Sequence, residues 1–386
     1  MQTGMHAHSH TVWANNRPLP GHLTGFAEVF RDAGYATGYI GKWHLEGRFG
    51  HLAGTQTRRG IPGGVVPEGK RRFGWDEWQG YDVSHEFLNV WKFNELGEKT
   101  PVDGYDWEPT WHTDQAVDFI TRQTKVNRPW CYYVAYGPPH DPEQCPPDFV
   151  KLYDGAEFPR PDGPLDARDT VTRRELDRRS AIYYGQVTAI DHEVGRLMAA
   201  LKHLEVADDT IVIYVSDHGD TLGSHLGTVG SLRTKATPHR SSFMTPFLVR
   251  WPKNNPQGLI LDTLVSSVDL APTILDLAGL HIPRQMQGLS MAKWCQGLHG
   301  PDQQVLYLGV GEPNTVDAWR AVWDGKFLYS TGRFNELYNC VADPEERENL
   351  RNIPGSQSVL RHYHQILVEQ AAHYHDPHYR YLLNSA

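Results

Sequence analysis

Apolar residues form short continuous runs in some segments of this chain and recur with helical spacing in others, and the two kinds of segment alternate. Short apolar and β-branched runs predict strands at residues 35–40, 130–136, 210–215, 247–250 and 264–267. Helical spacing predicts helices at 23–33, 111–125 and 268–277. The longest predicted helix has one apolar stripe, made of Tyr183, Val187, Ile190, Val194, Leu197 and Leu201. Strands alternating with helices predict an α/β protein built on a mostly parallel sheet flanked by helices.

The pattern changes after about residue 297. Residues 320–323 and 326–330 flank Asp324-Gly325, a strong hairpin signal, and a final helix is predicted at 356–372. We therefore expect a larger domain at 1–297 and a smaller C-terminal domain at 298–386, with an antiparallel sheet and a helix. Residues 45–75 show no periodicity and predict a long loop.

Composition and charge exclude some classes of partner. The chain has 386 residues and a formal net charge of −9, and its densest basic run is only Lys70-Arg71-Arg72, so we expect no nucleic-acid partner. No apolar run is long enough to span a membrane. The four cysteines have no metal-ligand spacing and are expected to be free and mostly buried. The cellular compartment and the oligomeric state stay open.

Charged residues follow three of the predicted strands. Lys42 and His44 come after the first, His140 after the second, and Asp217 with His218 after the third. Ligands of open parallel sheets bind beyond the carboxyl ends of the strands, so these residues are expected to meet in one site. Lys42 and His44 are two residues apart in extended chain and can face the same anion.

Several strings of this sequence resemble motifs of one enzyme family. The string AGYATGYIGKWHL at 33–45 closely resembles the second signature of sulfatases, and TGMHAHSHTVWANNRPLP at 3–20 resembles the stretch after their nucleophile. Further matches are GPPHDP, VIYVSDHGDTLGSH, TPFLVRWP and ELYNCVADPEERENL. Together they cover nearly the whole chain. The resemblance implies a sulfatase of the alkaline-phosphatase superfamily, with an alkaline-phosphatase-like α/β fold.

The resemblance also implies roles for single residues. Lys42 and His44 would contact the sulfate oxygens and the nucleophile, and His140 would act at the bridging oxygen of the leaving alcohol. Fixed cations aimed at those oxygens would stabilise the charge of the transition state. Asp217 and His218 would be metal ligands. Carboxylate oxygens favour Ca²⁺, whereas an imidazole at 218 would also admit a softer metal.

Lys235 takes the place of a second sulfate-binding lysine of the family. The sequence departs from the family pattern just after it, because His239 replaces an aromatic residue and Arg240-Ser241-Ser242 replaces Glu-Glu-Ser. His10 and His225 are further candidates for the cleft, although a packing or surface role fits them equally well.

The nucleophile of the family is absent from this sequence. Sulfatases use a formylglycine made in a C-x-P-S-R string, and two adjacent Asp complete their metal site. The only C-x-P string here is Cys145-Pro146-Pro147, which is followed by no arginine at the required place and lies after the His140 loop. In family order, the nucleophile and the Asp pair would fall before Met1. A start assigned too late, a fragment of a longer protein, and a pseudoenzyme are all compatible with this.

The sequence therefore predicts a sulfuric ester hydrolase that has little or no turnover in the form given. A phosphodiesterase or phosphonate monoester hydrolase of the same superfamily is one alternative, and a non-catalytic anion-binding protein is another. A small-molecule or carbohydrate sulfate ester is the expected ligand. Seven aromatic residues could form a sugar platform or simply pack the long loops, and these are Trp75, Trp78, Tyr81, Trp91, Tyr105, Trp107 and Trp111.

Overall fold

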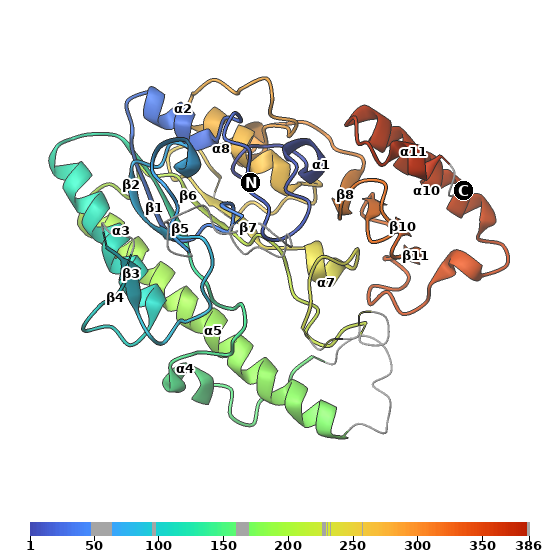
Figure 1. Ribbon diagram of the computed structural model, residues 1–386, viewed down its shortest axis with the longest axis horizontal. Helices are drawn as coiled ribbons and strands as arrows, with labels where there is room; N and C mark the ends of the chain where they lie inside the picture. Colours follow the sequence, from blue (N-terminus) through green and yellow to red (C-terminus); the bar gives the residue numbers. More distant parts are fainter. Residues whose placement is uncertain are drawn as a thin grey trace.

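Two sheets with their helices lie side by side in the molecule, a parallel one and an antiparallel one (Figure 1). The structure is a computed structural model. It describes residues 1–47, 64–94, 98–159, 170–225, 229, 231, 233–256 and 258–383. The α/β fold class predicted from the periodicity is confirmed.

The parallel sheet has the strand order β2-β1-β5. Its strands are β1 (Ala36–Lys42), β2 (Glu77–Tyr81) and β5 (Trp130–Ala135). Residues alternate between the two faces, so that Tyr39 packs with Phe26 on one face and Ile40 packs with Trp111 on the other. Both faces are covered, which explains the nearly continuous apolar sequence of these strands.

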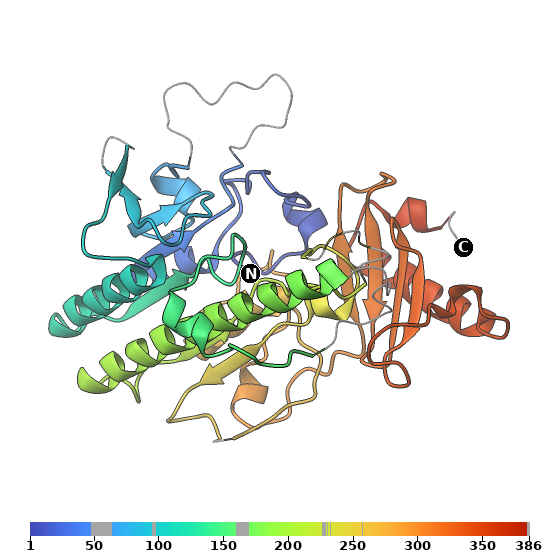
Figure 2. The ribbon, with the colours of Figure 1, turned by 90° about the horizontal axis from the view of Figure 1, so that it is seen from below.

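One pair of helices covers each face of the parallel sheet. On one face α2 (Phe26–Asp32) and α8 (Leu270–Leu277) share a core with β1. On the other face lie α3 (Glu108–Lys125) and α5 (Thr170–His203), and the C-terminal part of α5 runs beside α3 (Figure 2). The four predicted helices in these places are thus confirmed.

The next two strands form a separate ladder. Strand β6 (Val212–Val215) pairs antiparallel with β7 (Phe247–Arg250). The prediction of a strand at 264–267 is wrong. That segment leads into the 3-10 turn η2 (Ser267–Asp269), because the Asp269 carboxylate accepts the Ser266 N–H at 2.7 Å and closes a capping box at the start of η2.

The C-terminal part contains the predicted hairpin and helix. Strands β8 (Leu306–Val310), β9 (Trp319–Trp323), β10 (Phe327–Gly332) and β11 (Glu336–Asn339) form one antiparallel sheet, on which α10 (Gln357–His373) packs. The β9–β10 turn is fixed by Asp324, whose carboxylate accepts the N–H groups of Lys326 and Phe327. The domain division at residue 297 stays a prediction.

The remaining elements are short. They are α1 (Ala7–His10), η1 (Gly69–Arg72), β3 (Trp91–Phe93), β4 (Lys99–Pro101), α4 (Pro147–Lys151), α7 (Arg240–Phe243), α9 (Ala292–Cys295), η3 (Leu350–Asn352) and α11 (Tyr379–Leu382). Of the predicted loop 45–75, residues 48–63 lie outside the described residues, and η1 interrupts the rest.

Two expectations about single residue types are settled by the burial pattern. All four cysteines are free, and three of them are buried. Most of the aromatic residues proposed for a sugar platform serve in packing, because Trp75, Tyr81, Trp91, Trp107 and Trp111 are buried. In the described part of the chain, no helix is long and apolar enough to cross a membrane.

Candidate functional site

Lys42 ends β1, and the residue before it decides where the chain turns. Gly41 has φ +99°, and a Cβ there would lie 2.1 Å from the Ala135 carbonyl oxygen of the neighbouring strand. Only glycine fits so close to β5 with this backbone conformation. The G-K pair of the sequence therefore places the Lys42 side chain at the carboxyl end of the parallel sheet.

His44 is held in an uncommon backbone conformation. Its φ is +54°, a region that non-glycine residues visit rarely and often at functional sites. The His44 N–H donates to the Asp82 carbonyl at 2.7 Å, which continues the contact between β1 and β2. The ring Nε2 lies 3.4 Å from the Asn16 side-chain oxygen, so the N-terminal segment reaches this site as well.

Lys235 lies within electrostatic range of Lys42. Burial and then the charge of Lys235 lower the pKa of Lys42, and Asp217 and Asp141 oppose this effect. Burial also lowers the pKa of Lys235, and the same two carboxylates again oppose it. Two partly buried lysines, one of which lowers the proton affinity of the other, form a site suited to an anion.

Arg233 fixes the segment that carries Lys235. Its guanidinium donates to the Asp220 carboxylate and to the Pro139 carbonyl, both at 2.9 Å. Pro139 belongs to the loop of His140, so this one side chain joins the two loops. The arrangement keeps Lys235 and His140 at fixed places relative to each other.

His140 follows β5 on the loop that the sequence assigned to it. Its Nδ1 lies 2.5 Å from the Asp141 carbonyl oxygen and 2.9 Å from the Asp141 carboxylate, and it donates to them in the neutral ring. Nε2 is thereby left for a ligand. Burial, together with Lys235 and Lys42, lowers the pKa of His140 to about 4.

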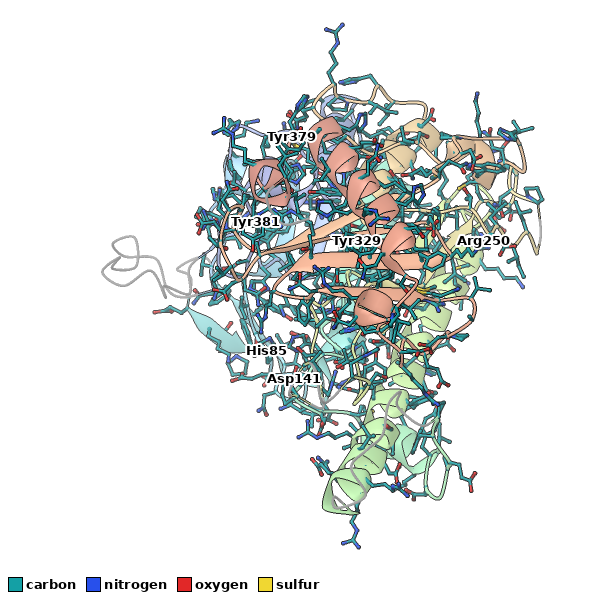
Figure 3. All side chains as sticks on the ribbon, turned by 90° about the vertical axis from the view of Figure 1, so that its right-hand side faces the viewer. His85, Asp141, Arg250, Tyr329, Tyr379 and Tyr381 are labelled. Atoms are coloured by element: carbon teal, nitrogen blue, oxygen red, sulfur yellow. The ribbon has the colours of Figure 1, made fainter. Side chains whose placement is uncertain are left out.

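His85 was not predicted and belongs to the same cluster. It lies on the loop after β2, stacks on His140 with ring centroids 4.6 Å apart, and has its Nε2 3.3 Å from Lys42 Nζ. Figure 3 shows it next to Asp141. The rule that ligands bind beyond the carboxyl ends of strands would have found it, but residues 77–81 are too short and polar to be recognised as a strand.

The groups of this cluster lie within electrostatic range of one another. Burial lowers the pKa of His44 to about 4, and so do Lys42, Lys235, His85 and His140. Groups from four separate loops thus face one space. Protonation of any of these histidines is unfavourable beside two lysines, and a bound anion would remove that penalty.

Asp217 and His218 follow β6 and lie at the edge of this space. The His218 N–H donates to the Asp217 carboxylate at 2.9 Å, and Nδ1 of His218 lies 2.8 Å from the Gly219 carbonyl. A ring that donates from Nδ1 keeps its Nε2 lone pair for a metal, which is the usual arrangement around ligating histidines. Nε2 lies 3.5 Å from the Asp217 carboxylate, so both could contact one cation.

The donor set is incomplete within the described residues. No group of three or more His, Cys, Asp or Glu side chains is placed there to hold a metal ion. Asp217 and His218 offer a carboxylate and an imidazole, which are donors of the kind that a divalent cation accepts, and their role as metal ligands stays a prediction.

The two additional histidine candidates lie away from this cluster. His225 is nearly buried, stacks on His239 at 3.8 Å, and has its Nε2 3.3 Å from the Glu346 carboxylate. His10 accepts the Val12 N–H at Nδ1, within the N-terminal segment. His225 serves in packing, and a place of His10 in the cleft stays a prediction. His239 and Ser242, in the stretch that departs from the family pattern, are buried too, and Ser242 accepts the Gly219 N–H at 2.7 Å.

A parallel α/β sheet whose strand ends carry lysines and histidines around an anion site defines a class of hydrolases of charged esters. Comparison with known families makes this specific. The sulfatase family profile matches residues 1–280, and a profile for the C-terminal region of N-sulphoglucosamine sulphohydrolase matches 233–373. The chain belongs to the sulfatase family.

Two similar proteins illustrate the relationship. The chain is 25% identical over 370 residues to an ulvan-active sulfatase of Formosa agariphila, covering 92% of this chain and 67% of that protein. It is 27% identical over 403 residues to the uncharacterized sulfatase YidJ of Escherichia coli, and this match covers 97% of this chain and 77% of that protein.

Among solved structures, the fold is similar to that of a yidJ sulfatase from Bacteroides fragilis, with a TM-score of 0.85, 23% identity, and 99% and 85% of the two chains covered. A structure in complex with D-glucosamine-2-N,6-O-disulfate has a TM-score of 0.75 at 20% identity, covering 97% and 87%. Phosphonate monoester hydrolase from Silicibacter pomeroyi has a TM-score of 0.76 at 21% identity, and the match covers 98% of this chain and 85% of that one. These three similarities concern the fold.

Proposed function

We propose that the cluster around Lys42 binds the sulfate group of a sulfuric ester. The observation that carries this proposal is the convergence of Lys42, Lys235, His44 and His140 on one space, where burial lowers the pKa of each of them and the charge of Lys235 lowers the pKa of the other three. An anion in that space relieves four unfavourable interactions at once. The two lysines supply the positive charge of this space, since His44 and His140 are neutral in the free site.

Each residue has a distinct task in this proposal. Lys42 and Lys235 donate to the sulfuryl oxygens, and the strained backbone of His44 holds its ring beside them. His140 is neutral in the free site because its pKa is about 4. The bound anion raises that pKa, so Nε2 can carry a proton to the bridging oxygen as the alcohol leaves.

Asp217 and His218 would hold a divalent cation, most simply Ca²⁺ because of the carboxylate, although the imidazole also suits a softer metal. Such a cation supplies positive charge that polarises the sulfuryl oxygens. Asp217 lies within electrostatic reach of both lysines, so metal and lysines would share the same sulfate.

The nucleophile limits what this chain is expected to do. Its 386 residues contain no C-x-P-S-R string, and the thiol of Cys145 is buried with its pKa raised to about 11. We infer a sulfuric ester hydrolase site that binds its ester but turns it over slowly or not at all in this form. A non-catalytic anion-binding role is the alternative that this feature favours.

Carbohydrate sulfates are the substrate class that we propose. The support comes from relatives, since the Formosa protein is named for its action on ulvan and one similar fold was solved with a disulfated glucosamine. The similar fold of a phosphonate monoester hydrolase makes phosphate esters the second class to be tested.

The test measures binding and turnover separately. The purified chain is titrated with glucose 6-sulfate by calorimetry and assayed with an aryl sulfate and an aryl phosphate diester. We expect sulfate-ester binding that weakens about 10-fold or more in Lys42→Ala and in Lys235→Ala, because each removes a charged hydrogen-bond donor. The exposed Lys202→Ala is the matched control and should bind as the unaltered chain does.

Three outcomes would contradict the proposal. Equal binding by the Lys42, Lys235 and Lys202 variants would remove the assigned anion site. Clear preference for the phosphate diester would overturn the choice of sulfate. Measurable sulfatase turnover by the 386-residue chain would show that the nucleophile has been sought in the wrong place.

A further inference from the structure

His85 is a polar side chain at the site that no motif of the sequence accounts for. It is exposed, and it lies on the loop between β2 and β3. Its ring is parallel to that of His140, with an angle of 7° between the planes, and Lys42 Nζ donates to its Nε2 at 3.3 Å. It therefore touches two of the residues assigned to the sulfate and the leaving group.

The loop of His85 is attached to the loop of His140. The side-chain oxygen of Gln144 accepts the N–H of Phe87 at 2.6 Å and that of Leu88 at 3.3 Å. Gln144 is itself fixed through its carbonyl, which accepts from Gln186 of α5 at 3.1 Å. The stacked pair of rings thus rests on two loops that are held together by a third element.

The hydrogen bond with Lys42 determines the tautomer of the neutral His85 ring. Since Lys42 is a donor only, Nε2 of His85 accepts, and the proton of the neutral ring lies on Nδ1. Nδ1–H is then available to an oxygen of a ligand. When an anion takes over the Lys42 ammonium, Nε2 also becomes available to the ligand.

The position of His85 assigns it to the alcohol part of the ester. Lys42, Lys235 and His44 surround the anion, whereas His85 lies beside His140 and keeps part of its ring in solvent. A leaving alcohol that extends past His140 toward solvent therefore passes the exposed His85 ring. An imidazole at this place offers a hydrogen-bond donor and a flat surface, both suited to a hydroxylated sugar.

We propose that His85 is a substrate-binding residue that recognises the alcohol of the sulfate ester, with a hydroxylated sugar as the preferred alcohol. This proposal rests on the proposed function of the site. In this proposal His85 contacts the alcohol, whereas Lys42 binds the sulfate group of any ligand that carries one.

Binding of two probes by the whole chain separates these roles. Inorganic sulfate presents the anion alone, and glucose 6-sulfate presents the anion with a sugar. In His85→Ala we expect affinity for glucose 6-sulfate to fall about 3- to 10-fold, as for the loss of one or two neutral hydrogen bonds, with affinity for inorganic sulfate unchanged. His85→Asn keeps a side-chain donor and should recover part of the loss, and the exposed His203→Ala should change neither affinity.

The possible results divide clearly. If His85→Ala binds both probes as the unaltered chain does, or loses both equally, recognition of the alcohol by His85 is wrong while the proposed sulfate site stands. If the unaltered chain binds neither probe, the proposed function fails and the role of His85 fails with it. Equal melting temperatures of the variants confirm that the comparison concerns binding.

Discussion

At the scale of single residues, Gly41 shows how the backbone of one position determines the site. Its φ of +99° and its distance to the Ala135 carbonyl exclude any side chain. We expect Gly41→Ala to destabilise the fold by more than about 2 kcal/mol, because backbone strain adds to overpacking against β5. Urea unfolding measures this change.

Gly34 provides the matched control for that substitution. Its φ is +91°, almost the same as that of Gly41, but a Cβ there would meet nothing within 4 Å. Gly34→Ala therefore isolates the backbone strain and should cost only about 1 kcal/mol. Equal losses in the two variants would show that the approach to β5 is not what requires glycine at 41.

At the scale of elements, α3 carries two buried titratable side chains one turn apart. Burial lowers the pKa of His112 to about 3 and raises that of Glu108 to about 8. The unfolded chain binds more protons at His112 below about pH 6.5, so stability falls as the pH falls there. The folded chain binds more protons at Glu108 above about pH 4.5, so stability falls as the pH rises toward 8.

These opposite pH dependences predict that the free energy of unfolding is constant over a middle pH range and decreases on either side of it. Between about pH 4.5 and 6.5 the two contributions cancel, and above this range Glu108 alone lowers stability by roughly 1 kcal/mol per pH unit. Glu108→Gln should abolish most of the decline between about pH 6.5 and 8, whereas the exposed Glu369→Gln on α10 should leave it unchanged. Thermal melts across this pH range test the prediction, and parallel curves for the two variants would contradict it.

The pattern of apolar residues predicted helices correctly where buried residues recur with the helical period. Helix α3 begins at Glu108, three residues before the predicted start, and Pro109 in its first turn was the available signal. The stripe on α5 was right for Ile190 and Leu201, which are buried, but Val187 is 41% exposed because the buried face there is made of Gln186, Ala189, Ile190 and Glu193. The strand predicted at 264–267 failed because a capping carboxylate outweighs β-branched residues.

The candidate site was predictable only in part, for a related reason. Lys42 and His140 lie at the ends of two strands that local sequence reveals, and the rule for parallel sheets applies to both, whereas Asp217 follows β6 of the antiparallel ladder. His85 follows β2, a strand with a polar sequence that exists through its pairing with β1. Its stacking on His140 and the joining of the loops through Gln144 and Arg233 depend on contacts between distant parts of the chain.

At the scale of the whole molecule, the edges of the strands differ in how they are protected. Among the described residues, β5 pairs only with β1, and β6 pairs only with β7. Strand β2 carries Glu77 and β7 carries Arg250, whereas β5 and β6 contain no charged residue and no proline. Apolar edges without such protection favour pairing with another chain. We therefore expect this chain to self-associate as its concentration rises, which sedimentation velocity can measure.

Two substitutions decide whether the unprotected edges cause that association. Tyr214 on β6 is 36% exposed and Leu248 on β7 is 58% exposed. Tyr214→Lys places a charge on an unprotected strand, and Leu248→Lys places one on a strand that already has Arg250. If edge pairing drives association, Tyr214→Lys reduces it more. If exposed apolar area drives it, Leu248→Lys has the larger effect, because it removes the more exposed side chain, and the explanation by strand edges is then wrong.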